Sequence, residues 1–583
     1  MANQTSVVDT LPGNRSDIRN IVLCVVAVAF ATLLAWPVGE IPYGDDFAYS
    51  HVALQLARTG HFSYNGWETN VLLLHSLWGA LFIRLFGFSF LCLRLSTVPF
   101  SLAVVALCYL LVRRTGLRPE LSLFVSLLLG LSPVFLPVAA SFMTDVPGLF
   151  FMLLSFYCFV RAAERSEMGG GYGWLAFGFL ASFLGGTGRQ VVWLVPIIVL
   201  PYLAWVRRKH RAFAFATIFS WLMVVVGMAA ITNWFNHQPY GVPQLSPFSE
   251  LRMALKKPLW ELNVAARLFL MILLLVLPAA IPLVWRSMLD TLRSSITRKL
   301  FVGGLLLAVA AAVCVHPSLA SIPWVPSTLN WEGVNGSFPL VGRPIVLARP
   351  VRFVVSLAVY FAACVLAGEF TNVRALARRA LSSLVNPQGT QFALSAVTIF
   401  NVLYFGLLVV RLADIEIFDR YLLITLPWLA AVLLLWAEDN QTGAATLKRA
   451  MPVAWATLAV LAFYAIASTQ DYWALGRARV TAVNTLIAAG VPRASIDAGL
   501  EYNGWTQLEK TGLINSRWVV NPRGFYKPNL TETPIVVPIY RLEYEPTVET
   551  AATSFGYVSY FSVLPPFHKR VSIDRVLASQ TLR

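Results

Sequence analysis

The sequence has few charged residues, and acidic ones are the scarcest. Only 13% of its 583 residues are charged, with 29 Asp and Glu against 45 Lys and Arg, while 57% are hydrophobic. The mean hydropathy is +0.66. Soluble domains carry roughly a quarter charged residues, so this composition excludes an ordinary soluble enzyme and indicates a protein with many membrane spans.

The basic excess does not indicate a nucleic-acid-binding protein, although the formal net charge is +16. The sequence has no basic stripe with interleaved aromatic residues. Its Lys and Arg residues stand instead in short clusters between apolar runs, which is the pattern that sets membrane topology. We therefore expect membrane lipids, and no nucleic acid, as partners.

Cysteine is also scarce. The six cysteines lie in or beside apolar runs, and no two form a CxxC pair; they are Cys24, Cys92, Cys108, Cys158, Cys314 and Cys364. This spacing excludes a disulfide framework and a zinc motif, and it predicts small core residues. No internal repeat occurs. The run 18–38 lacks a small-x-small cleavage site, so we expect it to be retained as a first span.

Long apolar runs are the main feature that the sequence does contain. They predict a polytopic α-helical membrane protein with about 13 transmembrane helices. The runs are 18–38, 91–112, 121–140, 146–162, 172–187, 190–206, 213–232, 264–285, 300–320, 351–368, 390–411, 420–436 and 450–468.

The positive-inside rule orients these spans. With the N-terminus in the cytoplasm, basic clusters such as "RRKHR" at 207–211 and Lys448 with Arg449 fall on the cytoplasmic side. An odd number of spans then places the C-terminal part on the outer side. The inverted orientation would reverse the charge bias, so we predict a cytoplasmic N-terminus.

The first outer connection, 39–90, is much longer than a connection needs to be. It contains a polar segment at 45–58 and an apolar segment at 71–86, which is interrupted by His75 and Arg84. We interpret the apolar segment as an interfacial helix. A spanning hairpin is the alternative, but it would invert every later connection and break the charge bias.

The tail differs in composition from the rest of the chain. A helical pattern at 474–491 is followed by the β-rich runs "ASIDAGLEYNGW", "TPIVVPIYRLEYE" and "FGYVSYFSVLP". We therefore predict two domains. Residues 1–470 form the transmembrane domain, and residues 471–583 form a small extracytoplasmic α/β domain without a recognisable catalytic motif.

A few ionisable residues fall on the predicted outer face. They are Asp45 and Asp46 after the first span, Asp145 in the tight turn "SFMTDVPG", Arg189 in "GGTGRQ", and Arg420 followed by Tyr421. Each has an ordinary explanation, because acids cap helix N-termini and arginines reach toward lipid headgroups. Charged groups converging on one side of a membrane bundle nevertheless indicate a site.

Sugar transfer from a lipid phosphate would use such a set of residues. The reaction needs a base to accept the proton of the attacking hydroxyl or amine, and positive charge to hold the leaving phosphate. Clustered carboxylates also suit a hard divalent cation. The histidines of the same loop, His51, His61 and His75, are potential nitrogen ligands, although polar contacts are their more common role.

The order and sidedness of these motifs resemble one family. The stretches "DDFAYSHVALQLARTGHF" and "TDVPGLFFMLL", with the late "RY" before an apolar run, are similar to motifs of the GT-C integral-membrane glycosyltransferases. The likeness is strongest to the branch of lipid A aminoarabinose transferases and protein O-mannosyltransferases, families 39 and 83. It covers roughly residues 20–470.

The resemblance implies a GT-C fold and a polyprenyl-monophosphate sugar donor. It also implies inverting transfer in a single displacement, on the outer face of a bacterial inner membrane. Asp45 matches the family's base, and Asp145 matches its second-loop acid, which orients the acceptor or a metal. Arg189 stands where relatives often have Lys, and Arg420 with Tyr421 matches the phosphate-contacting pair. Asp46 replaces the usual Glu and is assigned a helper or capping role.

Three questions stay open at this point. Relatives differ in metal use, so a divalent ion is neither required nor excluded, with Asp46, Asp145 and His51 as candidate ligands. The sequence does not name the sugar, or choose among lipid, glycan and protein acceptors. A transporter or flippase for a lipid-linked or anionic substrate is the main alternative function, although inverted repeats and midplane charges are not visible. A receptor with an outer ligand-binding tail is a third possibility.

Overall fold

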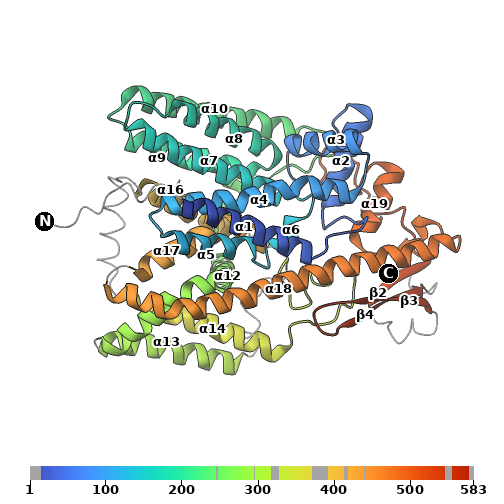
Figure 1. The fold of residues 1–583 in the computed structure, drawn as a ribbon. Helices are drawn as coiled ribbons and strands as arrows, with labels where there is room; N and C mark the ends of the chain where they lie inside the picture. The colour runs from blue at the N-terminus through green and yellow to red at the C-terminus, as the bar shows by residue number, and fades with distance from the viewer. Residues whose placement is uncertain are drawn as a thin grey trace.

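The computed structural model of the chain describes residues 15–244, 247–294, 296–316, 327–369, 391–411, 418–438, 441–544 and 554–576. Within these residues the protein is a bundle of helices with a small sheet at one end (Figure 1). Nine of the described helices are long and apolar enough to cross a bilayer. The predicted class, a polytopic helical membrane protein with a small C-terminal α/β unit, is therefore confirmed.

The helices occupy the following ranges in chain order. They are α1 Arg15–Leu34, α2 Asp46–Thr59, α3 Leu73–Phe86, α4 Phe90–Arg114, α5 Pro119–Gly130, α6 Leu136–Ala139, α7 Asp145–Ser166, α8 Tyr172–Gly188, α9 Leu194–Val206, α10 Arg211–Asn236, α11 Pro247–Ala254, α12 Pro258–Arg293, α13 Ile296–Val315, α14 Arg349–Ala367, α16 Gln391–Arg411, α17 Leu426–Glu438, α18 Gln441–Ala488 and α19 Leu500–Thr511. Short 3-10 turns lie at η2 Gln190–Trp193, η5 Asp419–Ile424 and η6 Arg493–Ser495.

Every predicted apolar run contains a helix, but not every helix is long. Three of the runs coincide with the shorter apolar helices Pro119–Gly130, Gln190–Val206 and Leu426–Glu438. The run 300–320 overlaps α13 and extends past its end, and the last residues of the run lie outside the described part of the chain. Figure 1 shows α8, α9 and α10 along one side of the bundle and α13 and α14 along the other.

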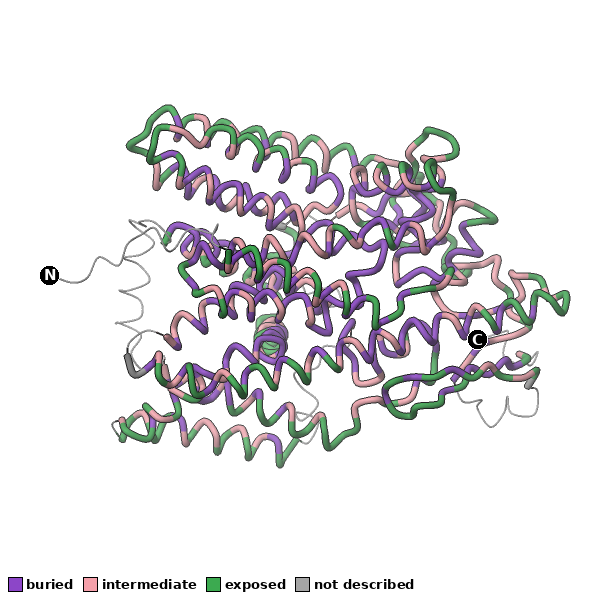
Figure 2. The backbone as a smooth tube through the Cα atoms, in the orientation of Figure 1, coloured by how far each residue is buried: buried purple, intermediate pink, exposed green. Residues whose placement is uncertain are grey.

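The pattern of buried and exposed side chains is that of a helical bundle surrounded by lipid. Figure 2 shows mostly buried positions along inner helices such as α7 and mixed or exposed positions on outer helices such as α13. The exposed positions on α10 and α13 carry large apolar side chains, among them Phe215, Val226, Phe301 and Leu307. An apolar outer surface is stable only against lipid, so these helices face the hydrocarbon of the bilayer.

The predicted first outer connection, residues 39–90, folds into α2 and α3, which lie together at the sheet end of the bundle, near α19 (Figure 1). The predicted interfacial segment is a helix, α3. Its 14 residues span only about 21 Å, less than the roughly 30 Å of hydrocarbon that an upright spanning helix must cross.

The C-terminal part begins inside a helix. The helix α18 is 48 residues long and continuous, so the predicted span 450–468 and the helical pattern at 474–491 form one element across position 470. A sheet of four strands follows, β1 Ile496–Asp497, β2 Tyr540–Tyr544, β3 Ser554–Phe561 and β4 His568–Arg575, in the order β1-β2-β4-β3. The pair β1 and β2 is parallel and the other pairs are antiparallel.

One β-rich run has a different structure from the expected one. In "ASIDAGLEYNGW" only Ile496 and Asp497 form a strand, and α19 begins at Leu500. The side chains of Trp505 and Leu508 are buried on one side of this helix, which is the helical spacing i, i+3. Gly504 lets α19 approach α2 closely, because a Cβ there would lie 2.4 Å from the ring of Phe47.

Candidate active site

A cavity of about 640 Å³ lies between the helices of the bundle, the segment 45–70 and the tail. Its apolar wall comes from the helices, with residues that include Leu149, Met152, Leu194, Met228 and Leu408. Its polar wall contains Asp45, Asp145, Arg189, Arg420 and Tyr421, all predicted site residues. The cavity therefore combines an apolar surface formed by membrane helices with a cluster of charges.

Asp45 immediately precedes α2 and makes no capping hydrogen bond with its side chain. Its Oδ1 instead accepts a hydrogen bond of 2.9 Å from the indole Nε1 of Trp67. Its Oδ2 lies 3.6 Å from Nη2 of Arg420, and the carboxylate is one quarter exposed. One oxygen of Asp45 is thus oriented by a neutral donor, while the carboxylate remains accessible from the cavity.

Asp145, the first residue of α7, lies between two arginines. Its Oδ1 is 2.9 Å from Nη2 of Arg189 and 3.3 Å from Nε of Arg420. Arg189 also donates a hydrogen bond of 2.8 Å from Nη1 to Oγ1 of Thr144. Only 2% of the Asp145 side chain is exposed, so this carboxylate orients both guanidinium groups from a buried position.

The charges of this group balance. Asp45 and Asp145 contribute two negative charges, and Arg189 and Arg420 contribute two positive charges. The guanidinium of Arg189 lies over the ring of Tyr421 at 5.6 Å, and that of Arg420 over Phe418 at 4.3 Å. Guanidinium groups held by carboxylates and aromatic faces bind phosphate oxygens well, because their donors are already ordered.

Asp46 lies apart from this group. The lining residues, drawn from the described part of the chain, include Asp45 but not Asp46. Oδ2 of Asp46 accepts hydrogen bonds from the backbone N–H of Phe142 at 2.9 Å and of Tyr43 at 3.3 Å. Burial raises the pKa of Asp46 to about 8, although those two donors and Arg94 act in the opposite direction. Its contacts fix the start of α2 against the turn before α7.

The histidines of the first outer connection do not meet at the charged group. Nε2 of His75 is 2.9 Å from the carbonyl oxygen of Phe142, and its ring stacks on the Phe142 ring at 4.1 Å. His51 is buried against the edge of Trp505, and His61 lies on an exposed loop. Burial lowers the pKa of His51 and of His75 to about 4, so both are neutral near pH 7.

These positions do not fit a metal site. Among the described residues, no group of three or more His, Cys, Asp and Glu side chains is arranged to hold an ion. Asp46 binds backbone N–H groups, Asp145 binds arginines, and His51 is packed against Trp505. The three candidate ligands therefore do not converge on one point.

The cavity also contains residues that the sequence did not reveal. Trp67 and Asn70 come from the first outer connection, while Glu250 and Arg411, 3.7 Å apart, come from α11 and α16. The tail contributes Ser516, Trp518 and Glu532. No local motif marks these positions; an indole in a polar stretch, as at Trp518, is the one available signal.

The tail segment is held firmly beside the first outer connection. The N–H of Ile514 donates to the carbonyl oxygen of Asn65 at 2.8 Å. The side chain of Asn515 donates to the carbonyl oxygens of Lys527, Leu530 and Thr531 and accepts the N–H of Lys527. Asn65 also accepts, through Oδ1, the N–H of Trp67 at 3.3 Å. Short contacts thus connect the tail to the residue that orients Asp45.

Part of the chain matches a known family. Residues 73–235 match the model of the dolichyl-phosphate-mannose-protein mannosyltransferases. The matched range contains Asp145 and Arg189 but not Asp45 or Arg420. It confirms that the chain resembles GT-C glycosyltransferases. No curated protein matches the chain in sequence.

Solved structures of three enzymes are similar to the chain. The Pmt1-Pmt2 protein O-mannosyltransferase of S. cerevisiae, bound to its sugar donor, has 17% identity and a TM-score of 0.29 over 38% of this chain and only 32% of that chain. ArnT from Cupriavidus metallidurans, bound to undecaprenyl phosphate, has 12% identity and a TM-score of 0.38 over 96% of this chain and 98% of that chain. The oligosaccharyltransferase AglB of Archaeoglobus fulgidus, with an inhibitory peptide and a dolichol-phosphate, has 13% identity and a TM-score of 0.41 over 80% and 58%.

Proposed function

We propose that the protein is a glycosyltransferase that moves one sugar from a polyprenyl-monophosphate donor to a hydroxyl or amine of an envelope acceptor. The reaction takes place on the outer face of the membrane, with the N-terminus of the chain in the cytoplasm and the sheet outside. In a bacterium this membrane is the inner membrane. The acceptor is a lipid, a glycan or a protein.

The proposal rests on one observation: a single cavity has both an apolar wall and a charged wall. The apolar wall of Leu149, Met152 and Leu194 suits an isoprenoid chain, which enters sideways from the bilayer. The guanidinium groups of Arg189 and Arg420 suit a phosphate. Asp45, whose Oδ2 is 3.6 Å from Arg420, is a base beside that phosphate position.

Asp45 acts as the general base. It accepts the proton of the acceptor hydroxyl or amine as the acceptor oxygen or nitrogen forms a bond to the anomeric carbon. The bond from that carbon to the phosphate oxygen breaks at the same time, and the electron pair leaves with the polyprenyl phosphate. Attack opposite the leaving group inverts the anomeric centre. The N–H of Trp67 orients one carboxylate oxygen, so the other faces the proton.

Arg189 and Arg420 stabilise the phosphate as its negative charge grows. The buried carboxylate of Asp145 keeps the two guanidinium groups in place before the donor arrives, which lowers the cost of ordering them. Tyr421 supports Arg189 through its ring face. Asp46 acts as a helper by fixing α2, and through it Asp45, against the turn before α7.

Trp518 and Glu532 contribute to the acceptor side of the cavity. Both come from the tail, whereas the apolar wall comes from the helices of the bundle. An exposed indole and a carboxylate that line the same cavity suit a polar ligand that has an apolar surface, such as a saccharide or a polar lipid headgroup. In this arrangement the bundle binds the donor and the tail binds the acceptor.

Mass spectrometry of envelope lipids and glycans tests the proposal. Cells that carry the active protein should show a mass shift of one sugar on one class of molecule, and this shift should be absent with Asp45→Asn. The exposed acid Glu509 on α19 provides a matched control, because Glu509→Gln removes a carboxylate away from the cavity. Full transfer by a folded Asp45→Asn protein would refute the base assignment, and lipid movement without sugar transfer would favour a flippase.

A further inference from the structure

Large apolar side chains are exposed at the turn that joins β3 to β4. Phe561 is 56% exposed, Val563 is 36% exposed and Phe567 is 56% exposed, while Leu564 is buried. The turn therefore presents two phenyl rings and a valine outward around one buried anchor. Contiguous exposed apolar groups of this size mark a contact surface.

The turn lies directly against α18. Nε2 of Gln470 donates to the carbonyl oxygen of Phe561 at 3.4 Å, and the N–H of Val563 donates to Oε1 of Gln470 at 3.2 Å. Both strands run alongside the outer half of α18, and their turn is directed back toward the bundle (Figure 1). The turn is thus the part of the sheet nearest to the transmembrane helices.

Gln470 marks the end of the apolar part of α18. The run 450–468 covers about 28 Å at 1.5 Å per residue, close to the roughly 30 Å thickness of the hydrocarbon layer. Asp471 is the first charged residue after that run. The turn therefore lies at the level where α18 leaves the hydrocarbon.

A second exposed apolar segment lies at the same level. The loop 338–345 precedes α14, and it exposes 58% of Phe338, 71% of Val341 and 55% of Ile345. The first residues of α14 continue this surface, since Val351 and Val354 are also exposed. The loop is therefore continuous with the lipid-facing surface of a transmembrane helix.

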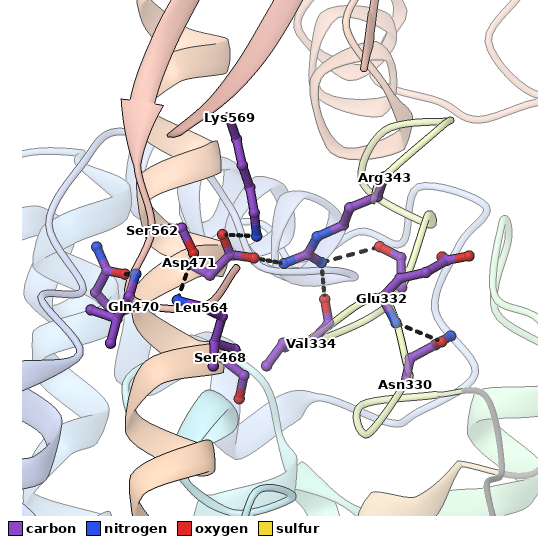
Figure 3. A network of polar contacts seen from close by, with 12 residues as sticks. Asn330, Glu332, Val334, Arg343, Ser468, Gln470, Asp471, Ser562, Leu564 and Lys569 are labelled. Carbon is purple, nitrogen blue, oxygen red and sulfur yellow. Dashed lines mark hydrogen bonds and ion pairs between the residues drawn. The ribbon is translucent and has the colours of Figure 1, made fainter. Parts of the chain in front are cut away.

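One buried ionic group holds both segments at the same level along α18. Oδ2 of Asp471 is 2.6 Å from Nη2 of Arg343 in the loop, and Oδ1 is 2.7 Å from Nζ of Lys569, two residues after Phe567 (Figure 3). All three side chains are fully buried. Arg343 also donates to the carbonyl oxygens of Val334 and Gly336. Buried ion pairs are a weak source of stability but an effective way to specify one arrangement.

We propose that the turn 561–567 and the loop 338–345 form a membrane-contact surface that rests on the bilayer in which the protein is embedded, at the boundary between headgroups and acyl chains. Asp471 positions both segments at this boundary through Arg343 and Lys569. Phenyl rings and aliphatic side chains at the end of a span are suited to this boundary. The sheet is thereby supported by lipid as well as by α18.

Depth-dependent quenching tests this contact. A Cys92→Ser, Cys314→Ser background leaves four buried cysteines. An environment-sensitive fluorophore is then attached to Phe561→Cys, Phe567→Cys or Val341→Cys in the full chain. The labelled proteins are placed in vesicles of phosphatidylethanolamine and phosphatidylglycerol, with and without brominated acyl chains. Tyr557→Cys on β3 is the matched control, because it is 59% exposed but lies farther from the turn.

Brominated lipid should quench the fluorophore at 561, 567 and 341 by at least twofold, and it should leave the fluorophore at 557 nearly unchanged. Equal quenching at all four positions, or none at the first three, would overturn the proposal. A blue-shifted but unquenched signal would also overturn it, because the surface would then be covered by protein. The independent labels keep the test valid if one variant fails to fold.

Lys569→Met tests the positioning role. Removing this ammonium frees the turn but leaves Arg343 on Asp471, so quenching at 567 should fall while quenching at 341 persists. An equal fall at both positions would indicate general unfolding rather than loss of one contact. Quenching at 567 that is unaffected by the substitution would contradict the role of Lys569. Neither readout depends on sugar transfer, so failure here is distinguishable from failure of the proposed function.

Discussion

Nη2 of Arg420 lies 3.6 Å from Oδ2 of Asp45, and this contact joins the turn before α17 to the start of α2. The same guanidinium lies 3.3 Å, through Nε, from Asp145. Arg420 therefore couples the proposed base to the proposed phosphate position. A change at Arg420 should therefore have a larger effect on donor binding than on the proposed base, Asp45.

Arg420→Ala should raise the KM for the lipid-phosphate donor by about 10-fold or more, since a charge-assisted hydrogen bond is worth roughly 1.5–3 kcal/mol. The KM for the acceptor should change much less. Arg420→Lys should recover only part of the loss, because an ammonium cannot reproduce the two-nitrogen contact. Steady-state kinetics with each substrate varied in turn measures the split, and an unchanged donor KM would exclude a phosphate role.

Asp145→Asn should weaken the binding of the lipid phosphate. The carboxylate of Asp145 contacts both Arg189 and Arg420, so its loss removes the partner that orders the two guanidinium groups. We expect the inhibition constant of polyprenyl phosphate to rise several-fold and kcat to fall, because the arginines must then be ordered when the phosphate binds. Product inhibition assays provide the measurement. Tighter product binding would instead indicate that the carboxylate mainly competes with the phosphate for the arginines.

Asp46→Asn should flatten the dependence of stability on pH. Burial raises the pKa of Asp46 from its ordinary value of 3.8 to about 8. Between these two pH values the folded protein keeps a proton that the unfolded chain has already released. Stability from this group is therefore complete at low pH and decreases as pH rises toward 8, by at most ~1.4 kcal/mol per pH unit. Thermal unfolding in detergent between pH 5 and pH 8 measures the slope.

Glu68 provides a second case for the same measurement. It is fully buried, and burial raises its pKa to about 8 as well. Glu68→Gln should remove a comparable part of the slope, and the double variant should remove both parts. A steep slope that survives in the double variant would show that other groups control it.

Trp518→Ala should weaken the acceptor and spare the donor. The indole is 61% exposed and lines the cavity, so its removal costs little packing. We expect acceptor kcat/KM to fall about 10-fold, while slow hydrolysis of the donor by water stays near its original rate. Trp260→Ala is a suitable control, because this indole is also exposed but does not line the cavity. Equal effects on transfer and hydrolysis would contradict an acceptor role.

The helices were largely predictable because hydrophobic periodicity and run length depend on local sequence. The tail was harder to predict. The pattern at 474–491 resembles a separate helix, but the 48-residue α18 passes through position 470 without a break. The residues of α19 also include Tyr and Trp, which favour strands in isolation. Their helical state depends on packing against α2, a contact between distant parts of the chain.

The site was predictable to the extent that sidedness could be inferred. The sequence indicated that Asp45, Asp145, Arg189 and Arg420 share one face, and the structure places all four on one cavity. It did not indicate that Asp145 would bind both arginines, or that Asp46 would turn away from its neighbour. Those outcomes depend on side-chain direction at the start of α2 and α7. Trp67 and Trp518 were missed because their roles arise only from tertiary contacts.

The continuity of α18 limits how the protein can capture a substrate. After Pro452 the helix has no proline and no interruption up to Ala488, so it works as a rigid strut. A strut of this kind does not allow the sheet to swing over the cavity as a hinged lid would. For the proposed transferase, the width of the entrance is therefore set when the chain folds, and acceptors should be sorted by whether they pass through a fixed opening.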